Sequence, residues 1–363
     1  MKKYIILITV LACIIIIQSC KDDDTNEPTK VVLDETPYIL EYGQLPPPNI
    51  ALDNPLTVQG VQLGRMLFYE KMLSKDGSMA CASCHLQEFA FSDTAQFSIG
   101  VEGKPGGRQA MAVFNMVWNE NEFFWDGRAH LVRDQSLGPI QDPLEMNETL
   151  ENVISKLSAS QTYKDQFTRA FGSAEITSEK MSLAMEQFMN SIVSYQSKYD
   201  EFLKDSTVFN ESEKRGRDLF FGEYNQFFPE ESGADCAHCH SGANFENDKY
   251  ANNGLDKYGE FKDDGREKVT KDSRDKAAFK ITSLRNIAIT APYMHDGRFQ
   301  TLEEVVNHYN NGLKASASLD PALEQTRGTG LRLTAQDKED LINFLKTLTD
   351  NNLTSDPKYA SPF

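Results

Sequence analysis

Two short segments of this chain place thiols and an imidazole at a spacing that can do chemistry. Residues 81–85 read CASCH and residues 236–240 read CAHCH. In a C-x-x-C-H segment the two thiols can form thioether bonds to one haem, while the histidine that follows binds its iron. A zinc site or disulfides are the alternative, but the two segments lie far apart and each has its own histidine. The sequence therefore predicts two covalent c-type haems, attached through Cys81, Cys84 and His85 in the first segment and Cys236, Cys239 and His240 in the second.

The first twenty residues predict export. Two lysines, a long apolar run and a small residue precede Cys20, an order typical of a signal peptide rather than of a spanning helix. The residues IQSC that end at Cys20 resemble a bacterial lipobox, which implies removal of residues 1–19 and acylation of Cys20. A plain signal peptide or an uncleaved anchor is the alternative. Residues 20–48 are acidic and proline-bearing, which predicts a tether.

Cysteine use and charge agree with a lipid-anchored exported protein, at the outer membrane and facing the periplasm or the cell surface. Of the six cysteines, Cys13 leaves with the signal, Cys20 takes lipid and four bind haem, so no disulfide is required. The formal net charge of −17 argues against nucleic acid as a partner. Such a surface would attract a basic electron-transfer protein.

The chain also repeats itself. The residues GRMLF at 64–68 return as GRDLF at 216–220, and WDGR at 125–128 returns as HDGR at 295–298. The length leaves room for two domains of ordinary size. We expect one haem domain used twice, with the boundaries 1–19 for the signal, 20–48 for the tether, 49–205 for the first haem domain and 206–363 for the second.

The elements that must position these groups are expected to be helices and loops. Apolar periodicity and capping boxes predict helices over 56–72, over 178–203, and from Thr301 and Thr334 onward. No alternating run is long enough to indicate a sheet. Residues 86–110 and 241–280, rich in Gly, Asp, Asn and Lys, predict long loops over the haem faces. The expected fold class is all-α, with two cytochrome c-like haem domains in tandem.

The two haem segments, with the residues FFWDGRAHLVRDQSLGPIQDPLEM at 123–146, resemble the bacterial di-haem cytochrome c peroxidases and the related MauG enzymes. The resemblance extends from about residue 45 to 350. The residues FKITSLRNIAITAPYMHDGRFQTLEEVVNHYN at 279–310 resemble the MauG-like branch. This resemblance implies that the first haem is the peroxide site and that the second holds or relays electrons.

The resemblance also implies roles for individual residues. His85 and His240 would be the proximal ligands of the first and second haem. Trp125 matches the tryptophan that lies between the haems and could shorten the electron path; taken alone, it would be a core aromatic. Gln135 and Glu145 match the distal glutamine and glutamate of the family. Glu145 would move the proton during peroxide cleavage and Gln135 would orient it, although a lone glutamate in this context would be a surface carboxylate.

One departure from the family concerns the first haem. Many family peroxidases carry a histidine after Ser-Ile-Gly, and this histidine blocks the first haem until the second is reduced. Here the segment 98–101 reads SIGV, and Val101 cannot bind iron. We therefore expect an iron that is open to peroxide without reductive activation. His130 is the only other histidine nearby in sequence, and we interpret it as structural.

The other departure concerns the sixth ligand of the second haem. Ordinary family peroxidases place a methionine fourteen residues after the histidine that matches His295, whereas this chain has Tyr309, as MauG-like enzymes do. The resemblance thus implies His240 and Tyr309 as the axial pair, and a hard oxygen ligand favours oxidised iron. His308 and Met294 are the competing ligands.

The resemblance further implies one calcium ion between the haems, bound by the side chain of Gln109 and the carbonyls of Thr290 and Pro292. Glutamine here replaces the usual asparagine. The function expected from all of this is a di-haem oxidoreductase that reduces hydrogen peroxide, with electrons from a small redox protein or from a protein substrate. The rival is a non-enzymatic di-haem electron-transfer lipoprotein, which would need two six-coordinate haems and would have no use for Glu145.

Overall fold

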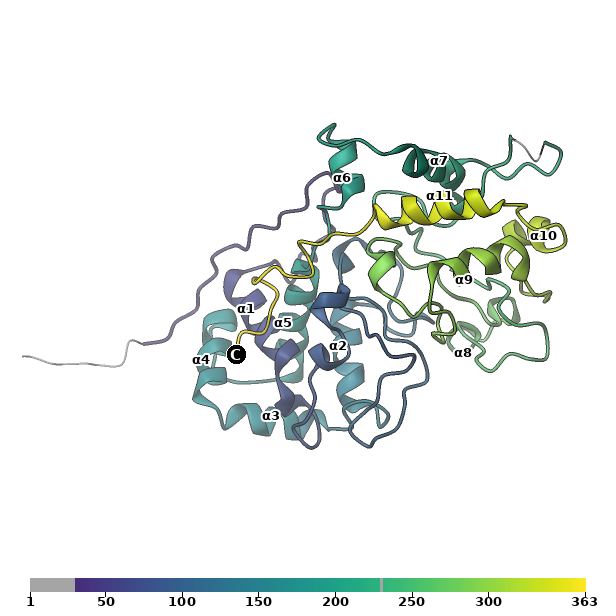
Figure 1. The fold of residues 1–363 in the computed structure, drawn as a ribbon. Helices are drawn as coiled ribbons and strands as arrows, with labels where there is room; N and C mark the ends of the chain where they lie inside the picture. The colour runs from purple at the N-terminus through teal and green to yellow at the C-terminus, as the bar shows by residue number, and fades with distance from the viewer. Residues whose placement is uncertain (1–29, 229–230) are drawn as a thin grey trace, which may run out of the picture. The chain divides into compact units, whose positions relative to one another are not determined.

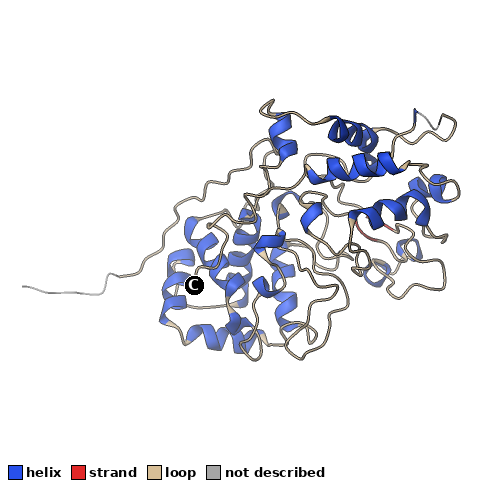
Figure 2. Ribbon diagram, viewed as in Figure 1, coloured by secondary structure: helices blue, strands red, loops and turns tan. Residues whose placement is uncertain are grey.

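Helices and the loops between them make up nearly all of the structure, a computed structural model that describes residues 30–228 and 231–363 (Figures 1 and 2). Within those residues the only named strands are β1 (Tyr250–Ala251) and β2 (Phe279–Lys280), which pair antiparallel. The expected all-α class is confirmed. The signal peptide and Cys20 lie outside the described residues. The helices are α1 (Val58–Tyr69), α2 (Val132–Gln141), α3 (Leu150–Ser158), α4 (Gln161–Phe171), α5 (Ser178–Ser191), α6 (Lys198–Leu203), α7 (Glu211–Phe221), α8 (Glu267–Thr270), α9 (Leu302–Asn307), α10 (Pro321–Arg327) and α11 (Ala335–Lys346).

The first hydrophobic core forms where α1 crosses α5. Thr57 caps α1 by accepting a hydrogen bond from the backbone N–H of Gly60, and the apolar face that follows buries Leu63 and Leu67 completely. Gly64 lies at the crossing, where an added Cβ would stand 1.9 Å from the carbonyl oxygen of Ala184 on α5. Only glycine lets the two backbones approach so closely.

The second core repeats this arrangement with α7 and α11. Gly216 on α7 faces Asp340 on α11, and an added Cβ would stand 1.9 Å from the Asp340 carbonyl oxygen. Phe220 and Phe344 are fully buried beside this contact, with ring centroids 5.2 Å apart. The repeated Gly-Arg motif of the sequence therefore marks the same helix crossing in both halves.

The predicted helix over 178–203 is interrupted. Helix α5 ends at Ser191, and α6 begins only at Lys198, after Ser197 and Asp200 form a capping box. The segment between them is extended because its backbone groups bond elsewhere: Asn115 contacts the carbonyl of Ile192 and both backbone groups of Ser194. The expected loop over 241–280 likewise contains short elements, among them β1, α8 and β2.

The helix expected to begin at Thr301 starts as an α-helix and continues as a π-helix. Helix α9 starts after the capping box of Thr301 and Glu304, and residues His308–Gly312 continue it as a π-helix. Single π-turns inside helices occur frequently at functional sites. Tyr309, the candidate iron ligand, lies in this π-helix.

The residues after α11 return to the first core. Tyr359 is buried there, with its ring edge-on to Phe91 and its hydroxyl donating to the carbonyl of Ser191. Arg65 of α1 donates to the carbonyls of Pro357 and Ala360, and Figure 1 shows the C-terminus beside α1. The C-terminal segment therefore completes the first core rather than the second.

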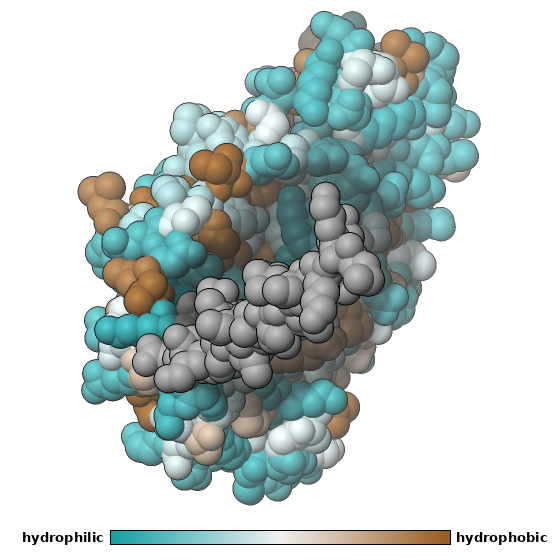
Figure 3. All heavy atoms as spheres, turned by 90° about the vertical axis from the view of Figure 1, so that its left-hand side faces the viewer, coloured by the Kyte–Doolittle hydropathy of each residue, from teal (hydrophilic) through white to brown (hydrophobic). Residues whose placement is uncertain are grey.

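The face shown in Figure 3 is mostly hydrophilic, with apolar side chains scattered singly over it. Isolated apolar side chains of this kind are normal on a protein surface. Across residues 30–228 and 231–363, no helix is both long and apolar enough to cross a bilayer.

Candidate functional site

Both C-x-x-C-H segments line one cavity of about 1440 Å³. A pocket for a single small ligand occupies roughly 300–1,000 Å³, so this cavity is large for one such group. Its walls come from the N-terminal and C-terminal halves of the chain alike. Cys81, Cys84, Cys236 and Cys239 are all free thiols, and no cluster of three or more His, Cys, Asp or Glu able to hold a metal ion occurs within the described ranges.

The first segment orients its histidine through the backbone. A short 3₁₀ turn over Cys81–Ser83 brings the His85 backbone N–H to the Cys81 carbonyl at 3.0 Å. Nδ1 of His85 lies 3.0 Å from the carbonyl oxygen of Phe91, so this nitrogen carries the proton and Nε2 is left to bind a metal. Burial lowers the pKa of His85, which favours the neutral, metal-binding form.

The second segment has the same local geometry. The His240 backbone N–H donates to the Cys236 carbonyl at 2.9 Å, and Nδ1 lies 3.2 Å from the Phe245 carbonyl and 3.1 Å from the Thr282 carbonyl. Burial lowers the pKa of His240 to about 4. Two thiols and one oriented neutral imidazole, facing a cavity of this size, form a donor set that fits a c-type haem in each half.

Three residues with predicted roles at the first haem line the same cavity: Trp125, Gln135 and Glu145. Gln135 lies on α2, and Glu145 lies in the turn that follows this helix. Burial, with a smaller contribution from Asp142, raises the pKa of Glu145 to about 6, whereas Arg128 opposes the shift. A buried carboxyl with a pKa in this range can both accept and release a proton near neutral pH.

The SIGV segment packs against Glu145. The backbone N–H of Val101 donates to the Glu145 carbonyl at 2.9 Å, and an added Cβ on Gly100 would stand 2.1 Å from the Leu144 carbonyl oxygen. Ser98, Ile99 and Gly100 of this segment line the cavity, whereas Val101 does not. His130 lies apart from the cavity: its side chain is 77% exposed, and its Nδ1 is 3.2 Å from Glu122.

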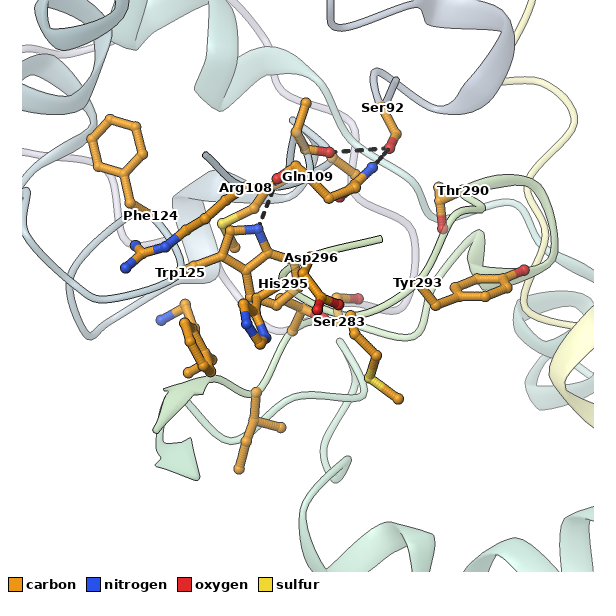
Figure 4. A pocket seen from close by; sticks show the side chains of 18 of the residues that line it. Ser92, Arg108, Gln109, Phe124, Trp125, Ser283, Thr290, Tyr293, His295 and Asp296 are labelled. Atoms are coloured by element: carbon orange, nitrogen blue, oxygen red, sulfur yellow. Dashed lines mark hydrogen bonds between the residues drawn. The ribbon is translucent and has the colours of Figure 1, made fainter. Parts of the chain in front are cut away.

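Trp125 connects the two halves. Its indole N–H donates to the Gln109 carbonyl at 2.8 Å (Figure 4). Its own carbonyl accepts from the Lys280 backbone N–H at 2.8 Å. His295, its counterpart in the second half, stacks on Phe279 with ring centroids 3.6 Å apart. Trp125 is thus held by backbone hydrogen bonds from both halves.

Sequence reasoning missed Arg108, which also lines the cavity. Its guanidinium bonds Asp126 of the WDGR motif and Asp263 of the C-terminal half, each at 2.7 Å. This arginine holds the pKa of Asp263 well below its usual range, through hydrogen bonding that outweighs burial. No local signal identifies Arg108, because Asp263 is 155 residues away in sequence.

On the side of the second segment, Tyr309 and Met294 both line the cavity, together with Asn253. The hydroxyl of Tyr309 and the sulfur of Met294 each lie 3.3 Å from Nδ2 of Asn253. Nε2 of His308 instead faces the Asn253 carbonyl at 2.9 Å, so a backbone group occupies that nitrogen. Burial raises the pKa of Tyr309 to about 12.

The residues expected to bind calcium, Gln109, Thr290 and Pro292, also line the cavity. Gln109 donates through Nε2 to the hydroxyl of Ser92 and to the Asp93 carbonyl, each at 3.3 Å. Figure 4 shows Gln109, Ser92 and Thr290 around the cavity. The calcium assignment stays a prediction.

A helical fold that presents two C-x-x-C-H segments to one cavity defines a di-haem protein of the c type. The sequence model of the family described as "Di-haem cytochrome c peroxidase" matches residues 58–208. Methylamine utilization protein MauG of Methylophilus methylotrophus is 33% identical over 300 residues, which cover 82% of this chain and 84% of that protein. Cytochrome c551 peroxidase of Pseudomonas aeruginosa is 32% identical over 303 residues, or 81% and 80% of the two chains.

A solved structure agrees with these sequence matches. A MauG-like protein associated with microbial copper homeostasis superposes with a TM-score of 0.79 at 34% identity, covering 89% of this chain and 98% of its own. The chain belongs to the di-haem cytochrome c peroxidase and MauG family. The expected family and the expected class of enzyme, a haem oxidoreductase, are confirmed.

Proposed function

We propose that this enzyme reduces hydrogen peroxide at a haem held by Cys81, Cys84 and His85, and that a second haem, ligated by His240 and Tyr309, shares or relays the oxidising equivalents. The observation that carries the proposal is the contrast between the two sides of the cavity. Beside the first segment lie a partly buried carboxyl with a raised pKa, Glu145, and the histidine-free SIGV loop. Beside the second segment, Tyr309 and Met294 line the cavity, each 3.3 Å from Nδ2 of Asn253.

When bound, the haems supply the iron redox chemistry for the reduction of one hydrogen peroxide by two electrons and two protons to two waters. The protein positions the groups that move the protons. Glu145 takes a proton from one peroxide oxygen and returns it to the leaving oxygen, and Gln135 orients the peroxide beside it. His85, oriented by the Phe91 carbonyl, presents a neutral nitrogen that would bind the iron of the first haem.

Trp125 is the proposed connection between the two haems. Its backbone hydrogen bonds to Gln109 and Lys280 support this role, because they hold the ring at the junction of the two halves. We assign one haem to residues 49–205 and one to 206–363. A calcium ion bound by Gln109 and the carbonyls of Thr290 and Pro292 would brace the same junction.

The electrons come from a small redox protein or from a protein substrate. The net charge of −17 supports a basic donor, since opposite charges steer association. We also propose export with residues 1–19 as the signal, lipidation at Cys20 and a tether over 20–48, which would hold the enzyme at the outer membrane, facing the periplasm or the cell surface. Mass measurement of the mature protein tests the lipid, since a chain that begins at an unmodified residue contradicts it.

The diferric protein, measured before and after one equivalent of peroxide, tests the enzyme against the electron-carrier alternative. We expect one high-spin and one low-spin haem, and a rapid spectral change on addition of peroxide. Two low-spin haems that peroxide leaves unchanged would support the electron carrier instead. In the same measurement, Tyr309→Phe should change the low-spin signal only; an unchanged signal removes Tyr309 from the coordination sphere.

A further inference from the structure

Two candidate iron ligands of unlike chemistry lie beside one amide. Nδ2 of Asn253 is 3.3 Å from the hydroxyl oxygen of Tyr309 and 3.3 Å from the sulfur of Met294, and all three residues line the cavity. A phenol oxygen is a hard ligand and a thioether sulfur a soft one. We propose that Asn253 is a positioning residue that holds Tyr309 as the ligand of the second haem and keeps Met294 away from the iron. The inference rests on the His240 and Tyr309 assignment proposed above.

Asn253 is attached to the element that carries Tyr309. Its carbonyl oxygen lies 2.9 Å from Nε2 of His308, the residue before Tyr309 in the π-helix. The backbone carbonyl of Asn253 thus contacts His308, and its side chain contacts Tyr309, the next residue of this element. A shift of the π-helix would break both contacts together.

The backbone on either side of Asn253 is also fixed. Asn252 is buried, and its carbonyl accepts from the Asp320 backbone N–H at 3.0 Å. Gly254 has φ +69, its N–H donates to the Asn252 side chain at 2.9 Å, and its carbonyl accepts from Lys314 at 2.8 Å. The amide of Asn253 is therefore preorganised rather than free to follow its partners.

The chemistry of the amide explains both parts of the proposal. A side-chain amide carries two N–H donors, so one group can serve both the oxygen of Tyr309 and the sulfur of Met294. A donor to a ligand oxygen holds that oxygen in place, as outer hydrogen bonds do for metal ligands generally. A donor to the sulfur holds the Met294 thioether at the amide, so that it does not turn towards the iron. Without the amide, the oxygen loses its support and the sulfur becomes available.

The choice between these ligands sets the redox behaviour of the second haem. Ligation by histidine and methionine raises the reduction potential of a c-type haem, and hydrogen bonds to the ligands are a further control. An oxygen ligand suits a centre that stores oxidising equivalents, whereas a thioether suits one that stays reduced. Asn253 therefore keeps the second haem suited to the oxidised state.

The test compares Asn253→Ala, Met294→Leu and the double variant as full-length proteins that carry both haems. In Asn253→Ala we expect the spectral signature of methionine-ligated haem. At a fixed applied potential, its ratio of reduced to oxidised second haem should rise at least about tenfold, equivalent to about 59 mV for one electron. The double variant should regain the tyrosine signature, and Met294→Leu alone should match the wild type.

The opposite results are equally definite. An Asn253→Ala protein with wild-type spectrum and potential, or a double variant that keeps the altered spectrum, overturns the proposal. Asn253→Leu, similar in size but without a donor, replaces Asn253→Ala if that variant retains too little haem. Loss of the second haem from both would show a merely structural role. Tyr309→Phe separates the role of Asn253 from the ligand assignment on which it rests. An unchanged spectrum in this variant contradicts Tyr309 as a ligand of the second haem.

Discussion

Glu145 illustrates how a chemical role depends on surroundings rather than on residue type. Among the chain's 54 acidic residues, Glu145 and Glu246 both line the cavity and have a raised pKa, about 6 for Glu145 and about 7 for Glu246. Burial is the main cause, because the charged form loses its water. A carboxyl in this state exchanges protons readily near neutral pH, as a general acid and base must.

Replacing Glu145 by glutamine should slow the reaction of the holoenzyme with peroxide by about a hundredfold or more, since the side chain keeps its size but loses the exchangeable proton. Stopped-flow measurement of the first spectral change gives the rate constant. Glu88→Gln, an exposed carboxylate beside the first haem segment, is the matched control and should react like the wild type. Equal rates in Glu145→Gln and wild type would rule out proton transfer by Glu145.

The rate should also depend on pH with a midpoint near 6. In the proposed mechanism the ionised form of Glu145 accepts the first proton, and this form dominates above a pKa of about 6. The rate constant is therefore at its maximum above this pH and falls about tenfold for each pH unit below it. The folded-state pKa lies above the ordinary value of 4.5, so ionisation of this buried carboxyl costs stability as pH rises through this window.

In Glu145→Gln the pH profile of the rate should be flat between pH 5 and 8, because glutamine does not titrate. The same variant should gain stability relative to the wild type as pH rises from 4.5 to 6, as measured by chemical unfolding at each pH. A sloping rate profile in the variant would assign the titration to another group.

For individual residues, the sequence predicts groups that are close together in the chain and misses groups that the fold brings together. The residues of each C-x-x-C-H segment are contiguous, so their spacing alone predicted haem attachment. Glu145, Gln135 and Trp125 came from a family resemblance, and their presence in one cavity agrees with it. Asn253 carries no local motif: its partners Met294 and Tyr309 are 41 and 56 residues away.

Among the elements, the two helix crossings determine where the haem segments lie. Gly64 and Gly216 let α1 meet α5 and α7 meet α11 at backbone contact. Each of these crossings lies shortly before a C-x-x-C-H segment in the chain. A residue with a side chain at either glycine must push its two helices apart.

Gly64→Ala and Gly216→Ala should each destabilise the protein by about 1–3 kcal/mol or more, because the added Cβ overlaps a backbone oxygen that has no room to move. Unfolding by denaturant measures the loss. Gly328→Ala is the control, since nothing lies within 4 Å of the position where its Cβ would be. If all three variants are equally stable, the crossings are not as tight as described.

Helix starts were easier to predict than helix ends. The capping boxes at Thr301 and Thr334 are formed by residues three apart, so the sequence alone indicates where α9 and α11 begin. The end of α5 depends on Asn115 and Asp350, whose side chains bond the backbone at Ser194 and Tyr195. These partners are far from α5 in sequence. The apolar periodicity continues past Ser191, so it does not indicate where the helix ends.

In the whole molecule, the C-terminal segment ties the end of the chain to the first core. Tyr359→Ala should destabilise the protein by about 3–5 kcal/mol, as expected for removing a buried aromatic ring. Tyr359→Phe, which loses only the hydrogen bonds to Ser191 and Val193, should cost about 1 kcal/mol.

Tyr359→Ala should affect the first haem more than the second. The ring of Tyr359 contacts Phe91, whose carbonyl orients His85, so Tyr359→Ala should broaden the spectrum of the first haem and leave the second unchanged. Thermal unfolding and the diferric spectrum measure the two effects. An equal change in the spectra of both haems would contradict the expectation that Tyr359 affects the first haem.

This return of the chain has a consequence for biogenesis. Leu353 and Tyr359 belong to the core beside the first haem segment, although they follow both haem segments in the chain. During synthesis, both haem-attachment segments therefore precede the residues that close the first core. A chain truncated before residue 353 would keep both haem-attachment segments but lack Leu353 and Tyr359, which close the core beside the first of them.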